Sequence, residues 1–341
     1  MSQHWKFWMK SKEAFLQSFQ NSLSSQFQGA QNWWTKYLFH FTDISNALSI
    51  LEHQALLSRN EATRLGLMKN DNANDDVIAK TSQEHQNYAR LYFAPSTPTQ
   101  YNNEGFKPQN AIQYNAHCPM PIMFIFDFNR VFMIDDIKFT DGNLSNNPTI
   151  YENVADLQNL NFNLIYHRSW FTTEERNSII NARHSEILVR DKLPLEGFLK
   201  LIAVRSEAEK ETFLYQMPTH LRAIYQNKIY IQPRPMIFVN NWLYVNKISI
   251  IDNIIHIEWH GCQDLDKCHN RYNLQLSVKK ISTGEKKSLS KNSWYPQNNL
   301  MKIRLSEEFQ DDFIELSLVL DGNLGYRNVI ANNLKIKSSS S

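Results

Sequence analysis

One carboxylate lies in a segment that is otherwise typical of a buried strand. Glu186 directly precedes the apolar run 187–189. A carboxylate beside an apolar core is costly to bury unless it is paired or hydrogen-bonded. Three interpretations are open: Glu186 is paired, it lies at the solvated edge of a sheet, or it is held in a cleft for chemistry.

Three residues far upstream could share such a cleft with Glu186. His40 and Thr42 end one predicted strand, and Arg59 follows the next predicted helix. These residue types suit ADP-ribosyl transfer from NAD, which breaks an N-glycosidic bond through an oxocarbenium-like state. The carboxylate can stabilise that cation and act as general base on the acceptor. Residue types alone leave unconnected positions as the commoner explanation.

Short strand-like runs and a few helical ones would position these residues. Strands are expected at 37–42, 90–94, 122–127, 186–189 and 199–204. Helices are expected after a cap at Asp43 or Ser45, and after Ser206, where Glu209 occupies the capping-box position. This mixture predicts an α+β domain with a mixed, mostly antiparallel sheet.

Changes in composition and residue pattern along the chain divide it into four parts. Residues 1–36 are expected to form an N-terminal extension with an amphipathic helix that ends near Gly29. Residues 37–234 are expected to form the α+β domain. In residues 235–335, strand-like runs recur around turns such as 282–285, which predicts a small all-β, sandwich-like domain. Residues 336–341 are expected to be a disordered tail. The polar segment 64–87 is expected to be a loop, and loops of this length are usually functional.

Composition excludes several classes of protein. The net charge is +2, so an anionic partner would need a local patch. Gly is scarce and no Gly-rich phosphate motif occurs, which argues against a doubly wound nucleotide fold. Three cysteines are too few for a disulfide framework, which fits a reducing compartment. Without an apolar span or a signal-like N-terminus, a cytoplasmic protein with no membrane contact is expected.

Seven local strings occur in an informative order. They are His40–His53, Leu56–Asn60, Arg90–Pro95, Pro98–Glu104, Phe139–Leu144, Ser185–Val189 and Val204–Glu209. In this order they resemble the DarT family of DNA ADP-ribosyltransferases, the toxins of bacterial toxin–antitoxin pairs. The resemblance covers roughly residues 37–220. It implies an ADP-ribosyltransferase-like domain that uses NAD as co-substrate and needs no metal.

The resemblance also implies site residues. The strand glutamate of the family is catalytic, which assigns that role to Glu186. The NAD-binding positions fall on His40, Phe41, Thr42, Ser49, Leu57, Ser58 and Arg59. The family's ribose-side arginine, in the loop before the Tyr-Phe strand, has no arginine counterpart at its position here. Lys80 is the expected replacement, with Arg64 as the second choice.

Aromatic and basic residues around the Tyr-Phe strand are expected to contact DNA. The candidates are Arg90, Tyr92, Tyr101 and Lys107, because single-stranded DNA needs stacking faces and cations. Strand core is the alternative for at least one of Tyr92 and Phe93. The string Pro98–Tyr101 resembles the corresponding string of the DarT subgroup that modifies guanine rather than thymine.

The resulting functional prediction is a toxin that transfers ADP-ribose from NAD to a base of single-stranded DNA. It would block replication in a toxin–antitoxin pair or in phage defence. Its partners would be single-stranded DNA and an antitoxin that hydrolyses the ADP-ribose–base bond. Two alternatives are an ADP-ribosyltransferase acting on RNA or protein, and a non-catalytic module that binds nucleic acid or NAD.

Two further groups have simpler explanations. His256, His260, Cys262, Cys268 and His269 are zinc-ligand types, but their spacing matches no standard pairing, so polar residues around a loop explain them better. A lysine cluster at 279–280, 286–287 and 291 could contact phosphates, although a solvated hairpin is the commoner meaning of such a run.

Overall fold

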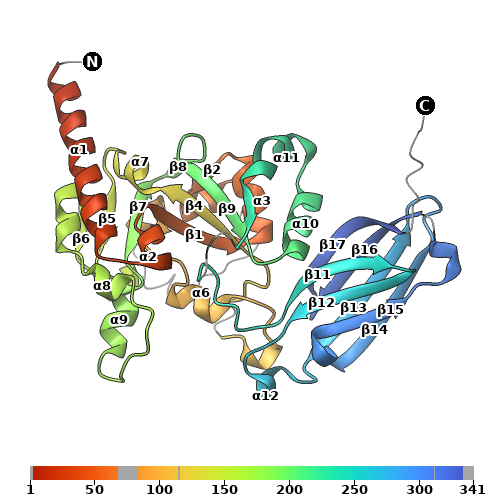
Figure 1. Cartoon of the computed structure of the whole chain (residues 1–341). Helices are drawn as coiled ribbons and strands as arrows, with labels where there is room; N and C mark the ends of the chain where they lie inside the picture. The colour runs from red at the N-terminus through yellow and green to blue at the C-terminus, as the bar shows by residue number, and fades with distance from the viewer. Residues whose placement is uncertain are drawn as a thin grey trace.

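The structure is a computed structural model that describes residues 3–67, 83–113, 116–232, 234, 236–310 and 312–332, with side chains from residue 9 onward. A mixed α/β body contains the N-terminus, and a group of long strands beside it contains the C-terminus (Figure 1). No helix within the described ranges is both long and apolar enough to cross a membrane.

Helices surround the sheet of the body. The α-helices are α1 (Gln3–Ser25), α2 (Gly29–Trp34), α3 (Ile44–Glu52), α4 (Arg59–Arg64), α6 (Pro98–Asn103), α7 (Phe128–Phe132), α8 (Phe162–Ile165), α9 (Arg176–Ala182), α10 (Glu207–Gln216), α11 (Thr219–Tyr225) and α12 (Leu265–Cys268). Short 3-10 helices span Glu84–Asn87, Gln109–Ala111, Leu144–Asn146, Val154–Asn159, Gln226–Lys228, Gln297–Asn299 and Glu307–Phe309.

A mixed sheet forms the centre of the body. In spatial order its strands are β10 (Ile229–Ile231), β9 (Leu199–Val204), β4 (Pro121–Asp127), β1 (Tyr37–Asp43), β3 (Tyr88–Tyr92), β7 (Glu186–Arg190), β5 (Lys138–Thr140) and β6 (Ile150–Tyr151). Only β10 and β9 pair in parallel among these neighbours. The predicted mixed, mostly antiparallel sheet is therefore confirmed.

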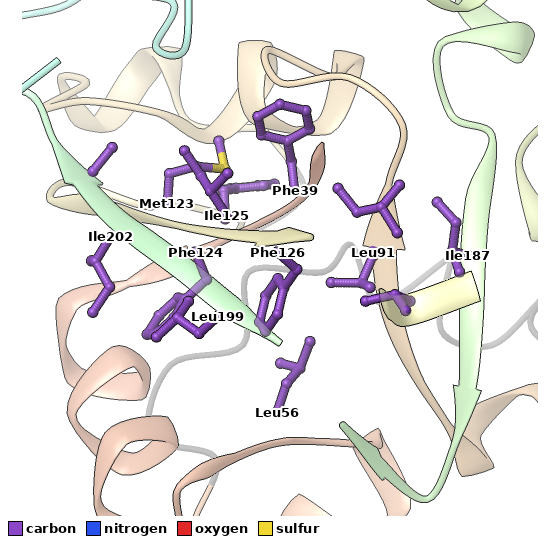
Figure 2. Close-up of a cluster of buried hydrophobic side chains, with 14 of the residues drawn as sticks. Phe39, Leu56, Leu91, Met123, Phe124, Ile125, Phe126, Ile187, Leu199 and Ile202 are labelled. Carbon is purple, nitrogen blue, oxygen red and sulfur yellow. The ribbon is translucent and has the colours of Figure 1, made fainter. Parts of the chain in front are cut away.

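Both faces of this sheet are covered, which explains why its central strands are apolar throughout. Figure 2 shows Met123 and Ile125 on one face of β4, and Phe124 and Phe126 on the other. All four are buried in the main core. Alternate residues of a strand point to opposite faces, so a strand with two covered faces needs apolar residues at every position.

The central sheet has very little strand pairing between β1 and β3. β1 pairs with β4 along its whole length, from Tyr37–Asp127 to Asp43–Pro121. With β3 it makes only the pair Phe39–Tyr92. The two strands therefore meet at one position and diverge on either side of it, and the sheet divides there into two halves.

Local capping residues start α3, which follows β1, and α10, which follows β9. Asp43 accepts hydrogen bonds from the Ser45 backbone N–H at 3.0 Å and from its hydroxyl at 2.8 Å, so Asp43 is the cap of α3. Ser206 caps α10 through the Glu209 N–H, as predicted. The return bond of the capping box is absent, because the Glu209 carboxylate accepts from the Arg205 N–H instead.

The N-terminal extension is two helices rather than one. α1 ends at Ser25, four residues before the expected end at Gly29, and Gly29 begins α2. Leu16 and Leu23 of α1 are buried in the main core. Phe19 packs with its ring centroid 5.8 Å from that of Phe162. The extension is thus docked on the body, although the first turns of α1 project beyond it (Figure 1).

The C-terminal strands form two antiparallel sheets around a second core. One sheet has the order β11 (Tyr244–Ile251), β12 (Ile254–His260) and β15 (Leu300–Arg304), and the other β14 (Lys286–Trp294), β13 (Tyr272–Lys280), β16 (Asp312–Leu320) and β17 (Asn323–Asn332). The short pair β2 (Ala55–Leu57) and β8 (Lys192–Pro194) belongs to the body. The expected hairpin turn at 282–285 joins β13 to β14. The sequence predicted an all-β structure for this part of the chain, and α12 departs from that prediction.

A disulfide closes the connection that contains α12. Cys262 and Cys268 are bonded, and Cys118 is a buried free thiol. The cysteine count correctly indicated that the chain has no framework of several disulfides, but it did not reveal this single disulfide. The count therefore does not support the expected reducing compartment. The bond also excludes these two cysteines from the zinc set considered above, and no cluster of metal-ligating side chains occurs in the described part of the chain.

A buried charge cluster joins the body to the C-terminal strands. The Arg205 guanidinium is 1% exposed and hydrogen-bonds the Glu209 carboxylate, including an Nε–Oε1 distance of 2.9 Å. It also lies 3.8 Å from Glu104, measured from Nη1 to Oε1. On its other side, Arg205 packs 4.3 Å from the ring centroid of Tyr244, the first residue of β11.

Glu104 extends this cluster to the chain that leads into β11. Its carboxylate accepts from the backbone N–H of Val239 at 3.0 Å and of Asn240 at 2.9 Å. It also accepts from the Gln100 side-chain amide of α6 at 2.7 Å. One buried carboxylate therefore fixes α6 and the connection to the C-terminal strands relative to each other.

Replacing Arg205 with Met should destabilise the whole chain. The variant keeps an unbranched apolar side chain but leaves Glu104 and Glu209 without their shared cation. Breaking a buried ion pair from one side costs about 3–5 kcal/mol. Urea denaturation should show this loss, whereas Arg304→Met, at an exposed position of β15, should change stability by about 0.5 kcal/mol at most. Equal midpoints for the two variants would contradict the role given to the cluster.

Candidate active site

Glu186 is the first residue of β7, and it is held from two sides. Its backbone N–H donates to Thr140 Oγ1 at 3.0 Å, and the Thr140 hydroxyl donates to the Gly142 carbonyl at 2.7 Å. Tyr92 of β3 lies directly opposite Glu186 in the strand register. The residue is 3% exposed. Glu186 is therefore a buried carboxylate of the sheet and not a solvated edge residue.

Arg90 is a cation that lies beside this carboxylate. It lies two residues before Tyr92 on β3, so the two side chains share one face of the strand. Arg90 Nη1 is 3.7 Å from Glu186 Oε1. The guanidinium remains about one quarter exposed, while Glu186 is enclosed. Arg90 therefore connects the buried carboxylate with solvent.

The environment of Glu186 is not fully satisfied. Oε2 is buried without a hydrogen-bond partner among the described residues. Burial raises the pKa of Glu186, and the charge of Arg90 and a hydrogen bond with Tyr92 oppose that rise. An unsatisfied buried carboxylate oxygen costs stability, so its presence is characteristic of a site that a ligand completes.

The Tyr92 side chain lies beside Glu186 and is not exposed as a stacking surface for DNA. Burial and the neighbouring carboxylate raise the pKa of Tyr92, so its hydroxyl stays protonated at neutral pH. Tyr92 and Glu186 are directly opposite each other on neighbouring strands, so their side chains lie on the same face of the sheet. This environment corresponds to the alternative in which Tyr92 belongs to the strand core.

His40 crosses the gap where β1 and β3 diverge. Its Nδ1 lies 3.0 Å from the Arg90 carbonyl oxygen, which can only accept, so Nδ1 carries the proton. Burial lowers the pKa of His40 to about 4, and the bond to Arg90 opposes this shift. The ring is therefore neutral at pH 7, and its Nε2 is a hydrogen-bond acceptor.

The other expected NAD residues lie on both halves of the divided sheet. Phe41 and Thr42 follow His40 on β1, and both are buried. Ser49 is half-buried on α3, where its hydroxyl donates to the Ser45 carbonyl at 3.4 Å. The structure thus groups Thr42 with His40 on one strand and places Ser49 one helix further along the chain.

A strand pair holds Ser58 and Arg59 next to the chain that follows β7. Leu57, the last residue of β2, pairs with Lys192 of β8, and β8 follows β7 after one intervening residue. The Ser58 N–H donates to that residue, Asp191, at 2.7 Å. Ser58 then caps α4, whose first residue is the half-buried Arg59. The pair therefore lies by the end of β7 opposite to Glu186.

The four expected DNA-contacting residues have different environments. Tyr101 of α6 is 58% exposed, and Arg90 is partly exposed. Tyr92 faces Glu186. Lys107 is 5% exposed, donates from Nζ to the Asn102 carbonyl at 2.6 Å, and lies 5.2 Å from the Trp242 ring centroid. Lys107 is committed to the interior, so we leave it out of the DNA-binding surface.

Lys80, expected to replace the family's ribose-side arginine, lies outside the described residues. The sequence analysis missed that Arg90 and Tyr92 contact Glu186. Their spacing of two on one strand was a usable signal, because it places both side chains on one face. The pairing of β3 with β7 that brings Glu186 to this face was not visible in the sequence.

The mixed sheet and its buried glutamate define an ADP-ribosyltransferase domain. A family model described as ssDNA thymidine ADP-ribosyltransferase, DarT, matches residues 39–244. The match spans more than half of the chain, and the chain belongs to the DarT family. It is an NAD-dependent ADP-ribosyltransferase of single-stranded DNA, so the predicted enzyme class and toxin family are confirmed.

Three solved structures illustrate the likeness. The chain is 18% identical to Thermus sp. 2.9 DarT in complex with ADP-ribosylated ssDNA, with a TM-score of 0.46 over 57% of this chain and 93% of that one. For the same DarT in complex with NAD+, the values are 18%, 0.43, 57% and 92%. For Thermosipho africanus DarTG in complex with ADP-ribose, they are 21%, 0.45, 69% and 57%. No curated protein matches the chain.

The buried carboxylate should make stability depend on pH. The raised pKa of Glu186 means that the unfolded chain releases this proton at a lower pH than the folded chain does. Stability is therefore lost as pH rises from the ordinary glutamate value through the raised one. Glu186→Gln removes this titration and should be more stable than the parent at pH 8 by about 1 kcal/mol.

Thermal denaturation between pH 4 and pH 8 would measure this difference. The advantage of Glu186→Gln should grow with pH, whereas Glu196→Gln, at an exposed loop position, should follow the parent at each pH. A constant difference between the Glu186 variant and the parent would show that the carboxyl titrates normally.

Proposed function

We propose that Glu186 is the residue that carries ADP-ribosyl transfer from NAD to a base of single-stranded DNA. The supporting observation is a buried carboxylate with an unpaired Oε2, next to the place where β1 and β3 diverge. Among the described residues, Glu186 Oε2 is the buried carboxylate oxygen that lacks a partner, and a carboxylate is the group that this reaction requires.

The chemistry assigned to Glu186 has two parts. In the first, its negative charge stabilises the positive charge that develops at the ribose C1′ as the bond to nicotinamide breaks and nicotinamide leaves with the bonding electron pair. In the second, it accepts the proton that the acceptor nitrogen loses as the new C1′–N bond forms. The raised pKa of Glu186 suits a general base that holds this proton.

Arg90 is our candidate for the cation that assists Glu186. The expected replacement, Lys80, is not among the described residues, whereas Arg90 stands 3.7 Å from the carboxylate and reaches solvent. A guanidinium at this position opposes the rise in the pKa of Glu186, and it can contact the ribose or its phosphates. This assignment moves Arg90 from the DNA surface to the catalytic centre.

The NAD site is proposed to extend from His40 and Thr42 on β1 to Ser58 and Arg59, with Phe41, Ser49 and Leu57 supporting these residues. A neutral His40 with a free Nε2 can accept a hydrogen bond from a ribose hydroxyl or a carboxamide. Arg59 is placed to pair with a phosphate at the start of α4. Both groups fit a dinucleotide that bridges the two halves of the sheet.

Tyr101 is proposed as the stacking surface for the DNA strand. It is exposed on α6, the helix that also carries Thr99, and Thr99 Oγ1 lies 3.2 Å from Nε2 of His184, two residues before Glu186. An unpaired base stacked there would lie one helical turn or less from the site. The matched family model is described for thymidine, whereas the string 98–101 is similar to the guanine subgroup, so both bases belong in the test.

The remaining assignments follow from the toxin function. We propose that modification of DNA blocks replication in the cytoplasm, and that a partner antitoxin hydrolyses the ADP-ribose–base bond, in a toxin–antitoxin pair or in phage defence. We also propose that residues 37–234 form the catalytic domain, and that the two C-terminal sheets at 235–335 form a small β-sandwich.

Glu186→Ala should abolish the transfer. The parent and the variant would be incubated with labelled NAD and with oligonucleotides that contain thymine or guanine as their only modifiable base, followed by mass spectrometry of the product. Removing a general base and a charge stabiliser should lower the rate by about 10³-fold or more. Glu196→Ala, an exposed glutamate, is the control and should retain parent activity.

Several outcomes would contradict this proposal. Persistent labelling by Glu186→Ala would remove the catalytic role of Glu186. Labelling of RNA or protein with unmodified DNA would assign a different acceptor. NAD turnover no faster than in buffer would favour a binding module.

Arg90→Gln should reduce kcat and change its dependence on pH. Without the guanidinium, the pKa of Glu186 should rise further, so the acidic limb of the kcat profile should move to higher pH. Arg90→Lys, which keeps the charge, should restore the parent profile in part. Arg176→Gln, at an exposed position of α9, is the matched control. Weaker DNA binding with an unchanged pH profile would return Arg90 to the DNA surface.

A further inference from the structure

Two further cations lie on the face of the sheet that Glu186 occupies. Alternate residues of one strand share a face, and so do residues directly opposite each other on neighbouring strands. Leu188 follows Glu186 by two residues on β7. Arg90 of β3 and Lys138 of β5 are both opposite Leu188 in the register. Arg190, two residues further along β7, has the same orientation, so the face carries positive charge from Glu186 to the end of β7.

A small apolar cluster forms the floor between these cations. It consists of Tyr88, Leu144 and Leu188, which are all buried. Lys138 Nζ lies 5.9 Å from the centroid of the Tyr88 ring, and Arg190 Cζ lies 5.1 Å from it. Arg190 Nη2 also donates to the Tyr88 hydroxyl at 2.8 Å. One tyrosine ring therefore positions both cations on the sheet.

Both cations remain accessible to a ligand. The side chain of Lys138 is 24% exposed, and Arg190 is exposed at the end of β7. Lys138 Nζ pairs with the Glu152 carboxylate at 2.6 Å, but Glu152 is itself 69% exposed. A surface ion pair of this kind contributes little stability. Another anion can therefore take the place of Glu152.

A neighbouring histidine lies in the field of this face. Burial lowers the pKa of His85, the charges of Arg90 and Lys138 lower it further, and Glu84 opposes the shift. Positive potential on an open surface attracts anions such as phosphates. The face therefore suits an anionic ligand, which the small net charge of the whole chain did not indicate.

We propose that Lys138 and Arg190 bind backbone phosphates of the DNA strand on one side of the modified base. This inference rests on the proposed role of Glu186, which places that base at the head of β7. From Glu186 to Arg190 the strand advances by roughly 13 Å. Phosphates recur at every nucleotide of a DNA strand, so cations spread along this length match a polynucleotide.

The phosphates of NAD are the other source of this chemistry. The Ser58 N–H donates to the carbonyl of Asp191, the residue after Arg190, so the proposed dinucleotide site lies near one of the two cations. Lys138 favours DNA, because it is on β5. In the sheet order, β3 and β7 separate β5 from β1, which carries His40 of the proposed NAD site.

The variant Lys138→Gln/Arg190→Gln removes both charges. Fluorescence anisotropy of labelled single-stranded oligonucleotides, without NAD, would measure its affinity for DNA. We expect a loss of about tenfold, at about threefold for each exposed ion pair. The slope of log affinity against log salt should fall by about 0.7 for each lost phosphate contact. In transfer assays, KM for the oligonucleotide should rise, whereas kcat and KM for NAD should stay at the parent values.

Two single variants complete the test. Glu152→Gln releases Lys138 from its carboxylate and should bind DNA more tightly than the parent, a gain that does not depend on the folding of the double variant. Lys200→Gln is the matched control, because Lys200 of β9 is also exposed and pairs with Asp127 at 2.9 Å on the other half of the sheet. It should bind DNA as the parent does.

The outcomes separate this phosphate site from the function on which it rests. Parent affinity and salt slope in the double variant would overturn the site, and so would an equal loss in Lys200→Gln or no gain in Glu152→Gln. A higher KM for NAD with unchanged affinity for DNA would assign the two cations to the dinucleotide. Failure of the proposed function shows differently, as absent transfer by the parent or undiminished transfer by Glu186→Ala.

Discussion

The buried carboxylate of Glu186 is the constraint around which this molecule is arranged. A charge at the head of an apolar strand is unfavourable, and the structure offsets that cost only in part. Arg90 provides a charge at 3.7 Å, Tyr92 a hydroxyl, and Thr140 fixes the backbone. Oε2 remains unpaired. This unpaired oxygen lowers the stability of the sheet, and it is the atom that the proposed function assigns to the substrate.

The divergence of β1 from β3 makes this arrangement possible. Because they meet only at Phe39 and Tyr92, the ring of His40 crosses the gap, and each half of the sheet contributes separate functional groups. The residues proposed for the NAD site therefore come from segments that are distant in sequence.

Much of this could be predicted from local pattern, and the rest depended on contacts between distant segments. Asp43 and Ser206 were readable as caps because capping is decided within four residues. Glu186 was readable because a charge in an apolar strand is locally anomalous. The place of Arg90 required the register of β3 against β7, and the burial of Lys107 required Trp242, more than a hundred residues away. The disulfide was missed because a short loop between two cysteines looks the same whether or not they are bonded.

The charge cluster around Arg205 has a consequence for how this protein could evolve or be rebuilt. Glu104 belongs to the catalytic body, yet two of its hydrogen-bond donors are backbone amides of Val239 and Asn240 on the way to β11. Tyr244 covers the guanidinium from the first C-terminal strand. The C-terminal strands are thus not an exchangeable module. A chimera joined just before residue 239 would have to place two backbone amides and an aromatic ring in the same positions around the buried charges, so recombination is compatible with this fold only where that geometry is kept.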